Sequence, residues 1–320
     1  MKFQALPRKT FVLLFLLPIY LLMVKDAHAL TLKTHKITDT SYALVGELGP
    51  RTYDNLGLNN TLAFVITQSG VALIDSGSSP QAGKEISRRV AQVTDKPIKW
   101  VINTGSQDHR WLGNDYFQQQ GAEIIALKRT VITQQKYADD HVNGLKNVLK
   151  DQGEDIKARH ASRVIDSDHA KFKLDETAFE IIYFGDTHFP GDAVVWLPAQ
   201  EIVFTGDMVY VDRMLGILPY SNTISWQLAF QKMTQLKPKW VVPGHGNVYP
   251  LSRAQAETGD YLDFLVNGIK KAQEDWLEID DTVNLLSEKE RAAPFSHLRN
   301  FDPWHRTNIN RTYLLLESVE

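Results

Sequence analysis

Aspartate and histidine residues follow four predicted strands of this 320-residue chain, and glycine stands beside each of them. The first pair, Asp108-His109, comes after an apolar run from Lys99 to Ile102 and before Leu112-Gly113-Asn114, which opens a helix. Carboxylate and imidazole donors in one loop suit a divalent ion such as zinc. A capping Asp beside a surface His would give the same dipeptide, so this pair alone does not decide.

The pattern is repeated in three later segments, residues 187–192, 204–207 and 242–246, which contain His188, Asp207 and His245. Each segment adjoins an apolar β-type run and contains glycine. Loops at strand ends are where α/β folds place their chemistry. The four segments together therefore indicate a metal site built from separate strand ends.

The order of these segments resembles the metallo-β-lactamase superfamily, from Asn60 to the last helix. The family signature is Thr-His-x-His-x-Asp-His, then a His-Thr-x-Gly-Asp-like segment, then Gly-Asp after a strand, then Gly-His-Gly. Two histidines of the first motif are missing, and Gly105 and Gln107 are assigned to their places. The resemblance assigns the remaining family positions to Asp108, His109, His188, Asp207 and His245.

The resemblance implies a divided metal centre, of which only one half is complete here. The first site keeps His188 and the amide of Gln107, a poor set because zinc sites usually have three protein donors. The second site keeps all of its donors, which are Asp108, His109, His245 and Asp207. We therefore expect one bound zinc per chain, with His188 left free for another role; another divalent metal is an alternative.

The expected activity is hydrolysis of an ester, thioester or lactam-type carbonyl by metal-activated water. Asp207 would hold or deprotonate the water, and His188 would donate a proton or a hydrogen bond to the developing oxyanion. The alternative is a non-catalytic accessory protein that binds a metal or a ligand on the same fold. Iron redox chemistry would need two metals and a flavin partner, and nothing in the sequence supplies either.

Supporting residues are predicted around this centre. Asp75 ends an apolar run in an Asp-x-Gly turn and is expected to orient a ligand, together with Gln107, although it could be only a turn residue. The segment 210–220 mixes aromatic, aliphatic and cationic side chains. It suits a pocket wall in which Arg213 and Tyr220 hold a partly apolar, perhaps anionic small molecule, or it is ordinary loop packing.

The first 29 residues match a secretory signal peptide. Basic residues precede an apolar run from Phe11 to Val24, and Ala27-His28-Ala29 forms a cleavage site. The run is short for a membrane span, so we expect export to the periplasm or medium, cleavage after Ala29, and no stable membrane insertion. An uncleaved anchor is the alternative.

The composition limits which partners and which kinds of site are expected. Loss of residues 1–29 removes four basic residues and one acidic residue and takes the net charge from −3 to −6, which gives no reason to expect nucleic acid as a partner. Without cysteine there are no disulfides, thiolate ligands or cysteine nucleophiles. The sequence does not predict the oligomeric state.

Alternating strands and helices predict an α/β fold, and the resemblance specifies a four-layer αβ/βα sandwich over residues 30–320. The carboxyl-terminal segment 252–320 is predicted to be helical. A hairpin is expected over 61–74 and helices over 80–93, 112–120 and 129–150. His141, His160 and His169 have no partner at ligand spacing, so we expect them to be solvated.

Overall fold

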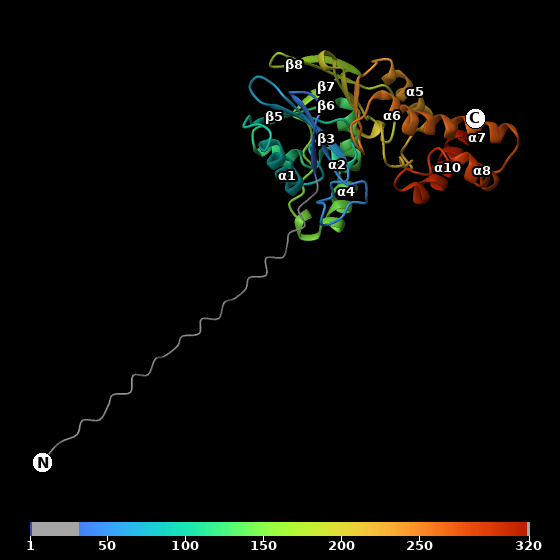
Figure 1. Cartoon of the computed structure of the whole chain (residues 1–320), viewed down its shortest axis with the longest axis horizontal. Helices are drawn as coiled ribbons and strands as arrows, with labels where there is room; N and C mark the ends of the chain where they lie inside the picture. Colours follow the sequence, from blue (N-terminus) through green and yellow to red (C-terminus); the bar gives the residue numbers. More distant parts are fainter. Residues whose placement is uncertain (2–31, 319–320) are drawn as a thin grey trace.

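Two β-sheets carry the site in the computed structural model, which describes Met1 and residues 32–318 (Figure 1). The first sheet has the order β1 to β7: Lys33–Lys36, Ser41–Val45, Thr61–Ile66, Val71–Ile74, Ile98–Ile102, Glu123–Leu127 and Arg163–Ile165. The second has the order β12-β11-β10-β9-β8, with β8 His169–Leu174, β9 Thr177–Ile182, β10 Val194–Leu197, β11 Ile202–Phe204 and β12 Trp240–Val242.

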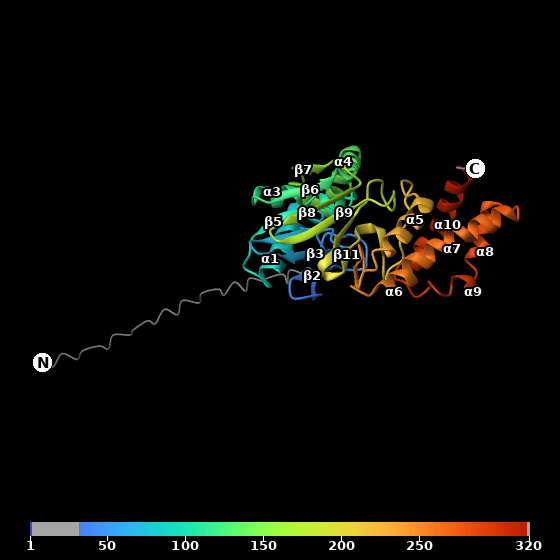
Figure 2. The same cartoon turned by 90° about the horizontal axis from the view of Figure 1, so that it is seen from above.

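Helices flank both sheets, and those from the carboxyl-terminal part gather at one end (Figure 2). They are α1 Pro80–Ala91, α2 Asp108–Trp111, α3 Asn114–Gln119, α4 Lys128–Leu149, α5 Thr223–Thr234, α6 Leu251–Ala254, α7 Asp260–Glu274, α8 Ile279–Leu286, α9 Lys289–Ala292 and α10 Phe301–Glu317. Short 3-10 turns occur at Lys150–Gly153, Pro198–Gln200 and Gly206–Met208, and a π-turn at Gln255–Gly259.

Three apolar clusters show the layer order. One joins residues of both sheets, such as Val65, Ile125 and Val195, and forms the core between them. A second packs the outer face of the first sheet against α1 and α3, and a third packs the second sheet against α5, α7 and α10. Strands β4, β10 and β11 are buried at every residue because both of their faces are covered. This arrangement confirms the predicted α/β sandwich.

The site lies where loops from both sheets meet. Strand β4 runs parallel to β5, and β11 runs parallel to β12, so the carboxyl ends of each pair lie at the same edge. Thr61, at the start of β3, joins the two halves: its N–H donates to the Gly244 carbonyl at 2.7 Å and its hydroxyl to that of Gly246 at 2.7 Å. Residues far apart in the chain are thereby held side by side.

The predicted hairpin and the helices over 80–93 and 129–150 are confirmed within two residues. The predicted helix over 112–120 differs, because two short helices occur and the first begins at Asp108. Asp108 and His109 therefore lie in a helical first turn, which aims their side chains in different directions. Among the described residues no helix is long and apolar enough to cross a membrane. The predicted signal peptide lies outside the described residues, apart from Met1.

Candidate metal centre

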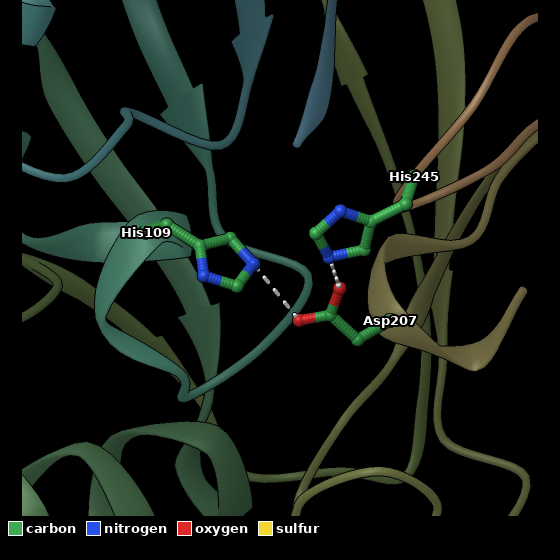
Figure 3. Close-up of side chains that lie close together, drawn as sticks. All are labelled: His109, Asp207 and His245. Atoms are coloured by element: carbon green, nitrogen blue, oxygen red, sulfur yellow. Dashed lines mark ion pairs between the residues drawn. The ribbon is translucent and has the colours of Figure 1, made fainter. Parts of the chain in front are cut away.

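Three side chains from three loops converge at the sheet edge, namely His109, Asp207 and His245 (Figure 3). Their donor atoms all lie within 4.8 Å of one another, and all three residues are buried. His109 comes from α2 after β5, Asp207 from the 3-10 turn after β11, and His245 from the Gly-His-Gly loop after β12. The Nε2 atoms of His109 and His245 each lie 3.2 Å from one oxygen of the Asp207 carboxylate.

The outer nitrogen of each imidazole is committed to a hydrogen-bond acceptor. His245 Nδ1 lies 2.6 Å from the Asn59 carbonyl, and His109 Nδ1 lies 3.2 Å from Asp108 Oδ1. A carbonyl can only accept, so Nδ1 of His245 carries the proton, and the guanidinium of Arg213, 3.1 Å away, cannot also donate to it. Burial and the charge of Arg213 hold the pKa of His245 well below its ordinary value.

A ring that donates its Nδ1 proton to such an acceptor and carries no second proton directs a bare Nε2 lone pair at the Asp207 carboxylate. Two such lone pairs beside Asp207 repel one another unless a cation lies between them, and the buried His109 Nε2 has no hydrogen-bond partner. Two imidazoles and one carboxylate make the His₂Asp donor set of a three-ligand zinc site with an open fourth position. The residues present thus fit one metal ion.

Arg110 was not predicted, yet it organises the back of the centre. It is fully buried, and it donates to Asp207 Oδ2 at 3.1 Å and Oδ1 at 2.6 Å. Its other N–H groups donate to Asp75 at 3.2 Å and to the carbonyls of Thr61 and Gly244 at 2.9 and 2.8 Å. All five guanidinium donors are therefore used.

The sequence contained a signal for Arg110. Counted without a gap from Thr104, the family signature has His109 at its Asp position and Arg110 at its last His. The geometry agrees with this count. His109 points into the centre, whereas Asp108 lies on the outer side of its ring and pairs with Arg51. Asp108 is thus not brought into the group of three donors, and it orients His109 instead.

Charge keeps the central carboxylate ionised. Burial alone would raise the pKa of Asp207, but the charge of Arg110 holds it well below 3.8. Asp75 accepts from the backbone N–H and hydroxyl of Thr104, both at 2.7 Å. Asp75 therefore supports Arg110 rather than a metal-facing histidine.

His188 and Gln107 form a separate pair in the same cavity. His188 Nδ1 lies 2.9 Å from the Gly216 carbonyl and Nε2 lies 3.0 Å from Gln107 Oε1. Burial lowers the pKa of His188 to about 4, so the ring is neutral with its proton on Nδ1. Gln107 must then turn its amide nitrogen towards Nε2. Gly105 offers no donor, and the described residues do not supply a second ligand set.

The cavity at the centre has a volume of about 170 Å³. Its lining includes predicted residues and several that sequence did not indicate: Arg51, Asn59, Gln107, His109, His188, Tyr210, Arg213, Gly216, Leu218, His245 and Trp304. Arg213 is in the wall as predicted. Tyr220 is not: it is 44% exposed and its ring packs on Tyr137 and Phe189.

The prediction of three solvated histidines holds only for His169, which is exposed and contacts Glu180. His160 is half-buried and stacks on Trp111, with ring centroids 5.1 Å apart. His141, on α4, is also half-buried and lies near Phe189 and the charge of Asp108. Helix α4 packs over the site, which spacing in the sequence does not reveal.

Replacing Asp192 by Asn is expected to flatten part of the pH dependence of stability. Burial and the nearby charge of Asp207 raise the pKa of Asp192 well above 3.8, so the folded state favours the protonated acid. Stability from this group is complete below pH 3.8 and is lost as pH rises through the raised pKa. The neutral amide removes this loss.

Urea unfolding of the wild type and Asp192→Asn at pH 5 and pH 8 checks this. The free energy of unfolding of the variant, relative to wild type, should be more favourable at pH 8 than at pH 5. Asp39→Asn is the control, since Asp39 is exposed and pairs only with Lys36. An equal difference at both pH values would contradict the assignment.

Sequence and fold comparisons agree on the family. The profile of the metallo-beta-lactamase superfamily matches residues 56–245, which include every donor of the centre. The chain belongs to the metallo-beta-lactamase superfamily. The family assignment supports metal-dependent hydrolase chemistry at the family level, and one solved metallo-beta-lactamase of similar fold, FIM-1 from Pseudomonas aeruginosa, is a mono-zinc form.

Individual relatives are distant. The metallo-beta-lactamase type 2 of Elizabethkingia meningoseptica is 24% identical over 217 residues, covering 67% of this chain and 78% of that protein. The 2,4-dinitroanisole O-demethylase subunit alpha of Nocardioides sp. is 25% identical over 63% of this chain, and the match spans only 56% of that relative. The solved metallo-beta-lactamase from Pontibacter korlensis superposes with a TM-score of 0.58 at 23% identity, covering 72% of this chain and 98% of the other.

Proposed function

We propose that this chain is an exported hydrolase that uses one zinc ion to cleave a carbonyl substrate of the ester, thioester or lactam type. The observation that carries the proposal is the convergence of two imidazole Nε2 atoms and the Asp207 carboxylate in one buried group. A bound zinc ion supplies Lewis-acid activation of water and of a substrate carbonyl. Export rests on the amino-terminal sequence alone.

The residues of the chain divide the remaining work. Asp207 is held ionised by Arg110, so it suits the role of a ligand and is a weak base. His188 is neutral, and its Nε2 on the cavity wall accepts from the amide of Gln107, so in place of that contact it can accept a proton or a hydrogen bond from a substrate. Its earlier assignment as a proton donor is less compatible with a pKa of about 4. Arg51 and Arg213 bring positive charge to the wall, which suits an anionic substrate.

One observation favours a second function. Arg110 already neutralises Asp207 by a two-point ion pair, so the three donors have no net negative charge of their own to attract a cation. A non-catalytic protein that binds a small ligand in a cavity lined by arginine and histidine would have the same geometry. The names of the relatives, a metallo-beta-lactamase and an O-demethylase subunit, leave the substrate open.

Metal content decides between the two functions. We expect about one zinc per chain by elemental analysis of protein purified without chelator, since three protein donors make one site. His245→Ala should lose the ion and the hydrolysis of p-nitrophenyl acetate. His35→Ala, on exposed strand β1, is the control and should keep both. Protein without metal, or with full hydrolysis after metal removal, would favour the binding protein.

A further inference from the structure

One wall of the site cavity comes from helix α10, which lies outside the residues matched by the family profile. Trp304 of α10 lines the cavity and lies flat against Gly216, where an added Cβ would meet its ring at 3.0 Å. Gly216 also accepts the hydrogen bond from His188 Nδ1. The indole therefore contacts Gly216, and Gly216 in turn holds the ring of His188.

The same helix fixes the loop that carries Arg213. Asn308 accepts from the Ile217 N–H at 2.8 Å and donates to the Leu215 carbonyl at 2.8 Å. Arg311 donates to the Ile217 carbonyl. Because Asn308 is buried and both its amide groups are used, this loop cannot easily move away from α10. The wall formed by Trp304 is thus held in place by hydrogen bonds around it.

The enclosed space is small. The volume of about 170 Å³ lies well below the range of roughly 300–1,000 Å³ typical of sites for drug-sized ligands. Side chains on the opposite wall, such as Gln107 and Arg51, are held by partners of their own. A bulky bicyclic substrate would therefore have to displace the indole ring.

The charge in this space is positive and incompletely balanced. Arg51 pairs with Asp108, but among the described residues Arg213 forms no ion pair, and its buried Nε has no hydrogen-bond partner. A guanidinium in this setting gains most from a ligand that is itself an anion with two acceptor oxygens.

We propose that Trp304 is a specificity-determining residue that restricts this site to small anions, in particular carboxylates with a short chain. The ligand carboxylate would lie against Arg213 and its chain against the indole. The proposal rests on the proposed function only for the position of the site, since it concerns what enters the cavity and not whether it is cleaved.

Binding of two carboxylates of different size tests this without any turnover. Isothermal titration of the purified protein with acetate and with cyclohexylacetate should show acetate bound at least ~tenfold more tightly, the order of discrimination that one hydrocarbon group produces in a fitted pocket. Trp304→Ala should reduce this preference to about threefold or less by opening the wall, and Trp304→Phe should lie between. Arg213→Met should abolish acetate binding both alone and in combination with a Trp304 substitution.

Trp276→Ala is the matched control, because Trp276 is a tryptophan of the same helical region that is 91% exposed. It should keep the wild-type preference, and thermal melts show whether each variant remains folded. Equal affinity of the wild type for both acids, an unchanged preference in folded Trp304→Ala and Trp304→Phe, or no acetate binding would each overturn the proposal. A wild-type protein that prefers acetate but hydrolyses none of the proposed substrates would instead refute only the proposed function.

Discussion

Arg110→Leu is expected to lower the free energy of unfolding by about 3–5 kcal/mol, the range measured when one partner of a buried ion pair is removed. The substitution leaves two buried carboxylates, Asp75 and Asp207, without their shared counter-charge. It also leaves the carbonyls of Thr61 and Gly244 without a donor. Urea unfolding followed by circular dichroism measures the loss.

Arg88→Leu is the control, since Arg88 forms an ion pair with Glu85 while its side chain is 52% exposed. A surface pair of this kind is screened by solvent and contributes little to stability, so the free energy of unfolding should barely change. Arg110→Lys should lower the free energy of unfolding by nearly as much as Arg110→Leu, because an ammonium cannot replace a planar group that donates five hydrogen bonds. A loss below about 1 kcal/mol for Arg110→Leu would mean that the carboxylates are protonated or hydrated when the arginine is gone.

His188→Ala is expected to keep the metal and to lose turnover by a factor of roughly 10²–10⁴, the usual contribution of a positioned acid or base. His188 is bound to Gly216 and Gln107 and is absent from the converging donor group. Elemental analysis gives the metal content, and hydrolysis of p-nitrophenyl acetate gives the rate.

Gln107→Ala separates the role of the ring from its position. It removes one contact of His188 Nε2 while Gly216 still holds Nδ1, so a smaller loss of turnover is expected. The pH profile of turnover should show a group with a pKa of about 4 in the wild type, and this group should be missing from the profile of His188→Ala. Loss of the ion together with activity in His188→Ala would make His188 a ligand and refute the assignment.

Much of the fold could be predicted because its signals are local. Two β-rich runs separated by Ser69-Gly70 marked the strands of the hairpin, and Pro80 marked the start of α1. The loops with His109, Asp207 and His245 were found for the same reason, since each follows a buried strand. Such patterns identify the residue that follows a strand, but they do not give the direction of its side chain.

The positions that the patterns did not give depend on side-chain direction and on distant contacts. Asp108 and His109 are neighbours in sequence, but a helical turn rotates successive side chains by about 100°, so only one of them faces the centre. Arg110 has partners 35 and 97 residues away, and Trp304 reaches the cavity from the last helix. No spacing rule in the chain connects these residues, because the contacts form only when the sheets pack.

The division of the three donors between the two halves of the chain, which Thr61 also joins, has a mechanical consequence. The centre takes one donor, His109, from the half of the chain that forms the first sheet and two, Asp207 and His245, from the half that forms the second. An ion held by all three would act as a crosslink, since separating the halves would break its coordination. Its release should therefore report on the opening of the sandwich, and bound metal should slow the exchange of amide hydrogens in both sheets together.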